Sequence, residues 1–467
     1  MSSIREETVK GIWWRQEAPE RQLQGEITYG PASGATVNLF GHIHADLNQR
    51  SLSQRFTLQG ITFQGKKVTL FDALITSSQF NMPGSTWCTV ASSSGIVGGH
   101  YAQPADVRFR NVRVWLDGLR DWTWTSGIDF RHETEPTRAL ITYKVPDTVH
   151  LGKISDLVTT LEFSGSTSPG AGKLSIQEDC ALVLEANTLT PYEKFADVFH
   201  PFQHFLSFAL QCPALALHVI GHIDQPREVI QGQQIFEDFL VIRQLSRTDF
   251  SSKTLLPHDM LFTLKESGET AENSIGKFFS NYDRLKPALD LYMSTLYHPD
   301  QLLRLRFLTL AQCLEAYHRV STHGKYMGDE QYSKGLKQLL WDSIPSEIDA
   351  PFRAALKNKL KYLNEYSLRK RIEILASKHT EIIGKLLGSA DEFAESVSEL
   401  RNKLTHPEPS SDALGKTEWK ELWRLSEKLA LLMETCFLDE FGFRRDRIRD
   451  IARTRSERAR RVHFGVL

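Results

Sequence analysis

The chain has 467 residues, of which 41% are hydrophobic and 24% are charged, and its 56 Lys and Arg residues nearly balance its 57 Asp and Glu residues at a net charge of −1. These values are typical of a globular protein with two or three domains, so they exclude a largely disordered chain, a collagen-like chain and a polytopic membrane protein. The balanced total argues against a protein that is basic throughout, although single patches can still carry strong charge.

The sequence predicts a cytoplasmic protein without a membrane partner. Residues 1–7 are charged and contain no apolar signal region. The longest apolar run, residues 205–220, is interrupted by polar residues and a proline and is too short to cross a bilayer. The cysteines form no CxxC pair, which indicates neither a disulfide framework nor a cysteine zinc site; they are Cys88, Cys180, Cys212, Cys313 and Cys436.

The first half of the chain is predicted to consist mainly of strands. Residues 68–76 are rich in β-branched and apolar side chains, and residues 107–116 alternate apolar with basic side chains. A third run, 139–145, ends before Pro146. Short strands separated by Gly and Ser clusters are typical of an antiparallel sandwich or a barrel-like domain.

Two further features of this half concern whether it forms one domain or two. A Gly- and Ser-rich stretch near residues 165–175 is either the tip of a long hairpin or the boundary of a subdomain. A helix is predicted from Thr190, as N-cap, and Pro191, in the first turn, to Pro213. Strand-like sequence returns at 215–220 and 239–242.

The second half is predicted to be helical, because apolar residues recur every three or four positions from about residue 270 onward. The expected helices cover 303–320, 333–341, 352–363, 368–378, 389–406 and 419–437. The predicted fold class is therefore α+β, with a β-rich antiparallel domain at residues 1–268 and an all-α helical bundle at residues 269–467. The bundle ends in a basic tail.

The helix predicted at 389–406 has clear signals at both ends. Ser389 and Glu392 form a capping-box pattern at its start. Acidic residues occupy the first turn and Arg401 lies near the last, an order that suits the helix dipole. Pro407 disfavours helical geometry at His406, so the helix is expected to end there.

Helical spacing divides this segment into a buried stripe and a polar sector. At about 100° per residue, the stripe contains Phe393, Val397, Leu400 and Leu404 within about 40° of one another. The polar sector lies about 80° to 220° from Phe393 and contains Arg401, Thr405, Asn402 and His406. These polar side chains are therefore expected to face away from the core that the helix covers.

The polar sector combines residue types that suit chemistry on a phosphate. Arg401 can bind a phosphate with its forked guanidinium, and His406 can transfer a proton near neutral pH. Asn402 can hold the imidazole or the substrate by hydrogen bonds. The same residues also fit a solvated helix end at which cations satisfy the dipole. Glu315, on an earlier helix, could orient Arg401 or simply face solvent.

At these positions the sequence resembles a known family. Residues 401–406, Arg-Asn-Lys-Leu-Thr-His, are similar to the RNxxxH form of the HEPN ribonuclease motif. Residues 308–319 resemble the first HEPN helix, and 368–375 resemble a middle segment of the ApeA-type branch. Four segments of the first half resemble the ApeA N-terminal domain, namely 11–14, 39–41, 60–70 and 98–101.

The resemblance implies a metal-independent endoribonuclease whose catalytic residues are Arg401, Asn402 and His406. The implied reaction is an attack of the ribose 2′-OH on the adjacent phosphorus, without a cofactor. It further implies RNA, often tRNA, as the substrate, and a homodimer formed through the HEPN domain. The biological role implied is that of an antiviral or abortive-infection effector, with the N-terminal domain sensing a phage-derived or cellular trigger.

Other interpretations remain open from the residues themselves. The helical domain could only dimerise and bind RNA or a ligand without catalysis, or the first half could be a carbohydrate- or peptide-binding sandwich. His200 and His204 are four residues apart, but the glutamate of a HExxH zinc motif is absent. Residues 444–461 contain nine arginines and three acidic residues, which fits either an RNA-backbone contact or a helix with internal salt bridges.

Overall fold

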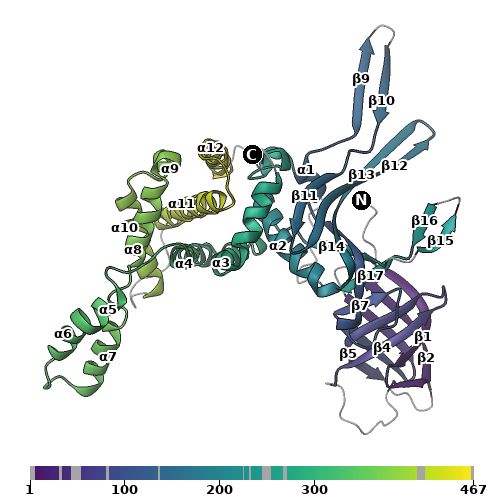
Figure 1. Cartoon of the computed structure of the whole chain (residues 1–467), viewed down its shortest axis with the longest axis horizontal. Coiled ribbons are helices and arrows are strands. Elements are labelled where there is room, and N and C mark those ends of the chain that lie inside the picture. Colours follow the sequence, from purple (N-terminus) through teal and green to yellow (C-terminus); the bar gives the residue numbers. More distant parts are fainter. Residues whose placement is uncertain are drawn as a thin grey trace. The chain divides into compact units, whose positions relative to one another are not determined.

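The structure is a computed structural model, and it describes residues 6–30, 34–43, 54–79, 84–134, 137–223, 226–230, 233–244, 254–266, 271–406 and 416–463. The chain divides into two compact units, Met1–Ser267 and Gly268–Leu467. Within the described residues the first unit contains the strands and the second is helical (Figure 1). The predicted fold class, an antiparallel β-rich region followed by a helical one, is therefore confirmed.

Part of the first unit is a closed antiparallel barrel. The sheet closes because β5 pairs with β6 as well as with β4. The barrel strands are β1 (Glu7–Arg15), β2 (Ala18–Gly30), β3 (Gly34–Phe40), β4 (Phe56–Thr62), β5 (Lys67–Gln79) and β6 (Trp87–Ser92). Trp13 is fully buried inside, and Gly60 on the neighbouring strand makes room for it. A Cβ at Gly60 would lie 2.2 Å from the Trp13 ring, so these two residues serve the barrel core.

The same sheet continues beyond the barrel in the order β7, β17, β14, β8, β13, β12 and β11. These strands are β7 (Ser94–Val97), β8 (Arg108–Leu116), β11 (Val149–Ile154), β12 (Leu157–Gly170), β13 (Lys173–Pro191), β14 (Ala216–His222) and β17 (Phe239–Arg243). Helix α2 (Tyr192–Leu210) packs against β8 and β13. Its buried face is aromatic, and Phe202 and Phe205 meet Trp122 of α1 (Leu119–Thr123) edge to face.

The predicted start of α2 is corrected by the sheet. Pro191 pairs with Arg108 of β8, and the amide of Tyr192 donates to the carbonyl of Val107 at 2.9 Å. This pairing keeps Thr190 and Pro191 extended, so the helix begins at Tyr192 rather than at Pro191. A long-range contact therefore outweighs the local Thr-Pro signal.

Two hairpins form small sheets of their own, and a third hairpin, β12–β13, belongs to the large sheet. The separate hairpins are β9 (Ile128–Thr134) with β10 (Thr137–Tyr143), and β15 (Pro226–Ile230) with β16 (Gln233–Phe236). The Gly- and Ser-rich stretch forms the far end of the β12–β13 hairpin, which pairs without interruption from Val158 to Gly170. Short 3-10 turns occur at Pro104–Asp106, Pro257–Asp259 and Leu264–Glu266.

The second unit contains helices throughout its described part (Figure 1). They are α3 (Ala271–Tyr297), α4 (Leu303–Ser321), α5 (Asp329–Gln331), α6 (Lys337–Asp342), α7 (Ala350–Leu360), α8 (Leu368–Lys378), α9 (Thr380–Leu387), α10 (Ala390–Thr405), α11 (Lys416–Glu440) and α12 (Arg445–His463). The single helix predicted at 333–341 is instead a π-helical turn, Tyr332–Leu336, followed by α6. Helix α7 begins earlier than predicted because Pro351 occupies its first turn.

The segment predicted to be a basic tail is helix α12. Ile448, Ile451 and Ala452 are buried where α12 packs on α9 and α11. Arg455, also on this helix, is only 8% exposed and pairs with two carboxylates of α11. At least one of the nine arginines therefore stabilises the fold.

Candidate functional site

Helix α10 carries the predicted site residues, and the turn before it fixes where it begins. Gly388 closes α9 with a φ of 84°, a conformation that glycine adopts without strain. The hydroxyl of Ser389 then accepts a hydrogen bond from the amide of Glu392 at 3.4 Å. Asp391 and Glu392 lie in the first turn, as the sequence predicts.

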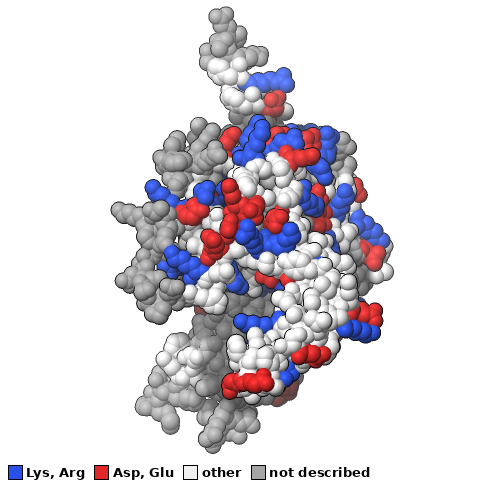
Figure 2. Space-filling model, turned by 90° about the vertical axis from the view of Figure 1, so that its left-hand side faces the viewer, with Lys and Arg blue, Asp and Glu red and all other residues white. Residues whose placement is uncertain are grey.

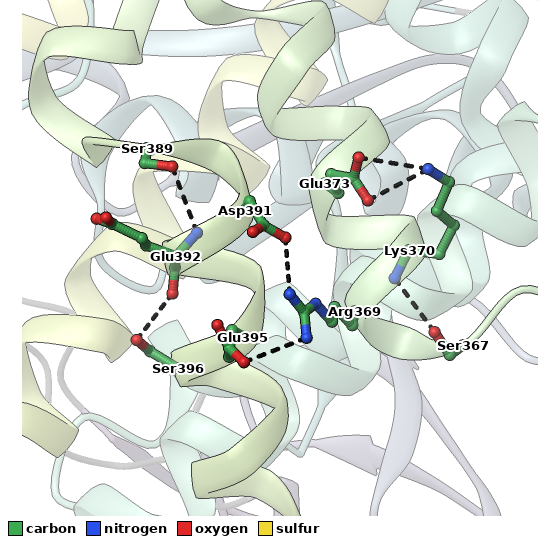
Figure 3. Close-up of polar contacts among 9 residues, drawn as sticks. All are labelled: Ser367, Arg369, Lys370, Glu373, Ser389, Asp391, Glu392, Glu395 and Ser396. Atoms are coloured by element: carbon green, nitrogen blue, oxygen red, sulfur yellow. Dashed lines mark hydrogen bonds and ion pairs between the residues drawn. The ribbon is translucent and has the colours of Figure 1, made fainter.

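Helix α8 holds the first half of α10. The guanidinium of Arg369 contacts Asp391 at 2.8 Å and Glu395 at 3.3 Å (Figure 3). Because these side chains are exposed, the contacts add little stability, but they show which turns of the two helices lie side by side. In Figure 3 the two helices run in opposite directions, with Ser389 of α10 near the level of Glu373 of α8.

The inner face of α10 is formed largely as the spacing predicts. Phe393 and Val397 are buried, and Ala394 beside them is also buried. Leu400 and Leu404 are only partly buried, in contrast to the expectation for the stripe. The helix is therefore packed tightly in its first half and less tightly near its C-terminal end, where the candidate residues lie.

The candidate residues form one surface at that end. Asn402, Thr405 and His406 are exposed and Arg401 is partly exposed, which agrees with the predicted polar sector. Arg401 donates to the side-chain oxygen of Asn402 at 3.2 Å. The amide of His406 donates to the carbonyl of Asn402 at 2.9 Å, and His406 itself leaves helical geometry at φ −129° and ψ 66°.

This arrangement leaves the Arg401 guanidinium and the His406 imidazole accessible. Within the described part of the chain, neither the Arg401 guanidinium nor the His406 imidazole is paired with a carboxylate. A phosphate could therefore be bound by Arg401 while His406 exchanges a proton with it. The hydroxyl of Thr405 is engaged within the helix, because it donates a hydrogen bond to the carbonyl of Arg401 at 2.9 Å.

Glu315 does not orient Arg401. Its carboxylate accepts from Arg319 at 3.0 Å, one turn further along α4. Arg319 also pairs with Glu365 at 2.8 Å, before the start of α8. Glu315 thus belongs to a charged cluster that joins α4 to the segment preceding α8.

Sequence reasoning missed a buried pair behind this cluster. Arg371 of α8 is 1% exposed and donates to Nδ1 of His318 on α4 at 3.0 Å. Its Nε donates to the carbonyl of Tyr366 at 3.0 Å. Burial, with the charges of Arg371 and Arg319, lowers the pKa of His318 to about 4. The two partners are 53 residues apart, so no local pattern could have indicated them.

The buried histidines predict a loss of stability in acid. Burial also lowers the pKa of His379 to about 4, whereas an unfolded histidine titrates near 6.5. The unfolded chain thus binds more protons between these values, so the stability is complete above about pH 6.5 and falls towards pH 4. We expect the melting temperature of the helical unit to drop by several degrees between pH 7.5 and pH 5.

The variant His318→Asn tests this cause. Its amide oxygen can accept the hydrogen bond from Arg371, and it does not titrate. Melting temperature against pH should therefore be flatter for His318→Asn than for the wild type, even if the variant is less stable at pH 7.5. Equal slopes for the two proteins would contradict the assignment.

Neither a metal cluster nor a membrane span is found in the described regions. In those residues no group of three or more His, Cys, Asp or Glu side chains is placed to hold a metal ion. None of the helices described combines the length and apolar content that crossing a bilayer requires. His204 and His200 lie on α2, where His200 has a pKa lowered to about 4 by burial and by Arg243.

Comparison with known protein families finds one match in the first half of the chain and one in the second. Residues 8–278, more than half of the chain, match the family model of the ApeA N-terminal domain 1. Residues 308–447 match the family model of the Apea-like HEPN domain, and this range includes all of α10. No match is found among curated proteins or among solved structures.

Proposed function

The chain belongs to the ApeA family, in which an ApeA N-terminal domain precedes an Apea-like HEPN domain, and on this premise we propose that it is a metal-independent endoribonuclease. HEPN domains of this type are generally ribonucleases. The observation that carries the proposal is the exposure of Arg401, Asn402 and His406 together at one helix end inside the HEPN match.

The proposed reaction is a transesterification at one phosphodiester of RNA. The ribose 2′-oxygen bonds to phosphorus while the bond from phosphorus to the 5′-oxygen breaks. A base accepts the 2′-OH proton and an acid donates a proton to the leaving 5′-oxygen. His406 supplies such a group, and Arg401 stabilises the negative charge that develops on the phosphoryl oxygens. The products are a 2′,3′-cyclic phosphate and a 5′-OH.

A homodimer supplies the missing second proton-transfer group. The reaction uses a base and an acid, and the motif of one chain provides one histidine, His406. Two α10 ends brought together would provide two imidazoles and two guanidiniums in one site. The exposed position of this surface supports such an arrangement, because nothing in the described part of the same chain covers His406.

The proposed biological role follows from the family. The substrate is proposed to be tRNA, and cleavage would act as an antiviral, abortive-infection response. The N-terminal unit, which matches the ApeA N-terminal domain, is proposed to sense a phage-derived or cellular trigger and to regulate the nuclease.

The proposal is tested by incubating the purified full-length protein with total RNA in EDTA. Cleavage should persist in the chelator, and the fragments should carry 2′,3′-cyclic phosphate ends and be enriched in tRNA. Ends that carry a 3′-OH, or cleavage that stops in EDTA, would exclude the mechanism. RNA binding without any cleavage would favour a regulatory binding protein instead.

Replacing Arg401 with alanine should reduce cleavage by about a hundredfold or more, because a charged donor to the transition state is lost. The melting temperature should stay within about 1 °C of the wild type, since in the described part of the chain the Arg401 side chain hydrogen-bonds only to its neighbour Asn402. Cleavage rate and thermal melting are measured on the same preparation. Arg304→Ala, an exposed arginine on α4, is the matched control. A large fall in melting temperature for Arg401→Ala would instead indicate a structural role.

A further inference from the structure

A small helical insertion lies between α4 and α8. We define the arm as residues 325–363, which contain α5, the π-helical turn, α6 and α7. Helix α6 packs on α7 and on the π-helical turn, while α8 packs on α4, α9 and α10 (Figure 1). Tyr332 is the one side chain of the arm that is buried.

The outer surface of the arm combines exposed apolar groups with lysines. Phe352 is 57% exposed and Tyr362 is 68% exposed. Residues 350–364 contain four cations and no acidic residue; the cations are Arg353, Lys357, Lys359 and Lys361. Figure 2 views the molecule from the side of the arm, and its lower part shows uncharged surface with basic and acidic side chains at its borders.

Helix α7 presents this surface on one side only. Leu356 and Leu360 are partly buried, and Lys357 lies over the Trp341 ring of α6 at 4.4 Å from its centroid. Lys359 is exposed seven residues after Phe352, which places both on the same side of the helix. The helix therefore turns Lys357 towards Trp341 of α6, keeps Leu356 and Leu360 partly buried, and leaves Phe352 and Lys359 to solvent.

The base of the arm is held firmly. The amide of Tyr326 donates to the carbonyl of Asn364 at 3.0 Å, and the amide of Tyr366 donates to the carbonyl of Gly324 at 2.8 Å. The Asn364 side chain bonds both the amide and the carbonyl of Met327, at 3.0 and 2.9 Å. Buried Arg371 then fixes Tyr366, so the arm is joined rigidly to α8.

The arm is attached near the end of α10 that carries the candidate site. Helices α8 and α10 are packed together and run in opposite directions (Figure 3). Arg369, at the start of α8, contacts Glu395, and α10 continues for ten residues beyond Glu395 to Thr405. At 1.5 Å per residue this is roughly 15 Å, which carries Arg401 and His406 beyond the N-terminal end of α8, the end to which the arm is joined.

We propose that the exposed side chains on α7 and just after it, namely Phe352, Lys359, Lys361 and Tyr362, bind single-stranded segments of the RNA substrate. Bases stack on Phe352 and Tyr362 while Lys359 and Lys361 contact phosphates. This inference rests on the proposed ribonuclease activity for the identity of the bound polymer. It places substrate binding on a surface separate from the bond that is cut.

The charge of the surface favours RNA over a protein partner. Lysine is depleted at protein interfaces relative to other surfaces, whereas it is the usual neutraliser of nucleic-acid backbones. Neither Lys359 nor Lys361 has an acidic partner among the described residues. Lys325 and Lys334, by contrast, are paired with Asp329 and Glu330 and are not assigned to the surface.

The test measures RNA binding without cleavage, in full-length protein carrying His406→Ala. The probe is a fluorescein-labelled single-stranded RNA of about 20 nucleotides and mixed sequence, long enough to span several stacking sites. Lys359→Glu with Lys361→Glu should raise Kd at least tenfold and reduce the slope of log affinity against log salt by about 1.4. Phe352→Ala with Tyr362→Ala should raise Kd about tenfold with little change in the salt slope.

The β4–β5 turn offers a matched control. Lys66 and Lys67 are exposed there, beside Phe63, which is 64% exposed. Lys66→Glu with Lys67→Glu and, separately, Phe63→Ala should leave Kd within twofold. Equal effects at the two places, or arm variants that leave Kd unchanged, would overturn the inference. So would a change in oligomeric state, by sedimentation, without a change in RNA affinity, because it would mark the arm as a protein interface.

The experiments can distinguish a failure of the binding surface from a failure of the proposed ribonuclease activity. RNA affinity that depends on the arm in a wild type that never cuts RNA would support the binding surface and reject the nuclease. Cleavage by wild type with a KM that the arm variants do not change would support the nuclease and reject the binding surface.

Discussion

Replacing His406 with alanine should reduce the rate of RNA cleavage by about a thousandfold and leave the fold intact. The imidazole is exposed and lies just past the last helical residue of α10, so its loss opens no cavity. Its backbone hydrogen bond to Asn402 is kept in the variant. In a dimeric site both proton-transfer groups disappear together, which makes the expected effect larger than that of a single lost base.

Cleavage is measured as the initial rate on labelled tRNA, with thermal melting of the same samples. His298→Ala is the matched control, because His298 is also exposed, lies in the same unit and follows a long helix. The control should cut at the wild-type rate. An active His406→Ala protein would reject the assigned site, and a control that is equally inactive would show that the loss is not specific.

The features of the site that the sequence predicts are those determined by residues close together in the chain. Ser389 caps α10 and Phe393 and Val397 mark its inner face, so spacing alone places Arg401 and His406 on the outside. These signals lie within one segment of fewer than twenty residues. The catalytic role of the residues is an additional inference from the family, since the same spacing also fits a solvated helix end.

The part that could not be predicted depends on partners distant in sequence. The bond of Arg371 to His318 joins two helices that are separated by the whole arm. In the first unit, Pro191 remains extended because it meets Arg108, although Thr190 and Pro191 look like a helix start. The closure of the barrel likewise follows from the second pairing of β5 with β6, which strand patterns do not encode.

The arginine-rich segment at 444–461 is compatible in sequence with an RNA contact or with a helix held by salt bridges, and for Arg455 the structure shows salt bridges. Arg455 contacts Glu427 and Glu434 of α11, each at 2.7 Å. Glu427 also pairs with Arg306 of α4 at 2.6 Å, and Glu434 accepts a hydrogen bond from Tyr292 of α3 at 2.8 Å. This network connects four helices, and its central pair, Arg455 and Glu434, is buried, so its charges depend on one another.

Replacing Arg455 with alanine should therefore destabilise the helical unit by about 3–5 kcal/mol, because Glu434, only 2% exposed, would keep a buried charge without its cation. For a unit of this size that corresponds to a fall of roughly 10 °C in melting temperature. Arg453→Ala is the matched control, since Arg453 is exposed on the same helix and should change the stability by less than about 0.5 kcal/mol. Thermal melting of the full chain decides the result. If Arg455→Ala melts like Arg453→Ala, the network does not hold the bundle together.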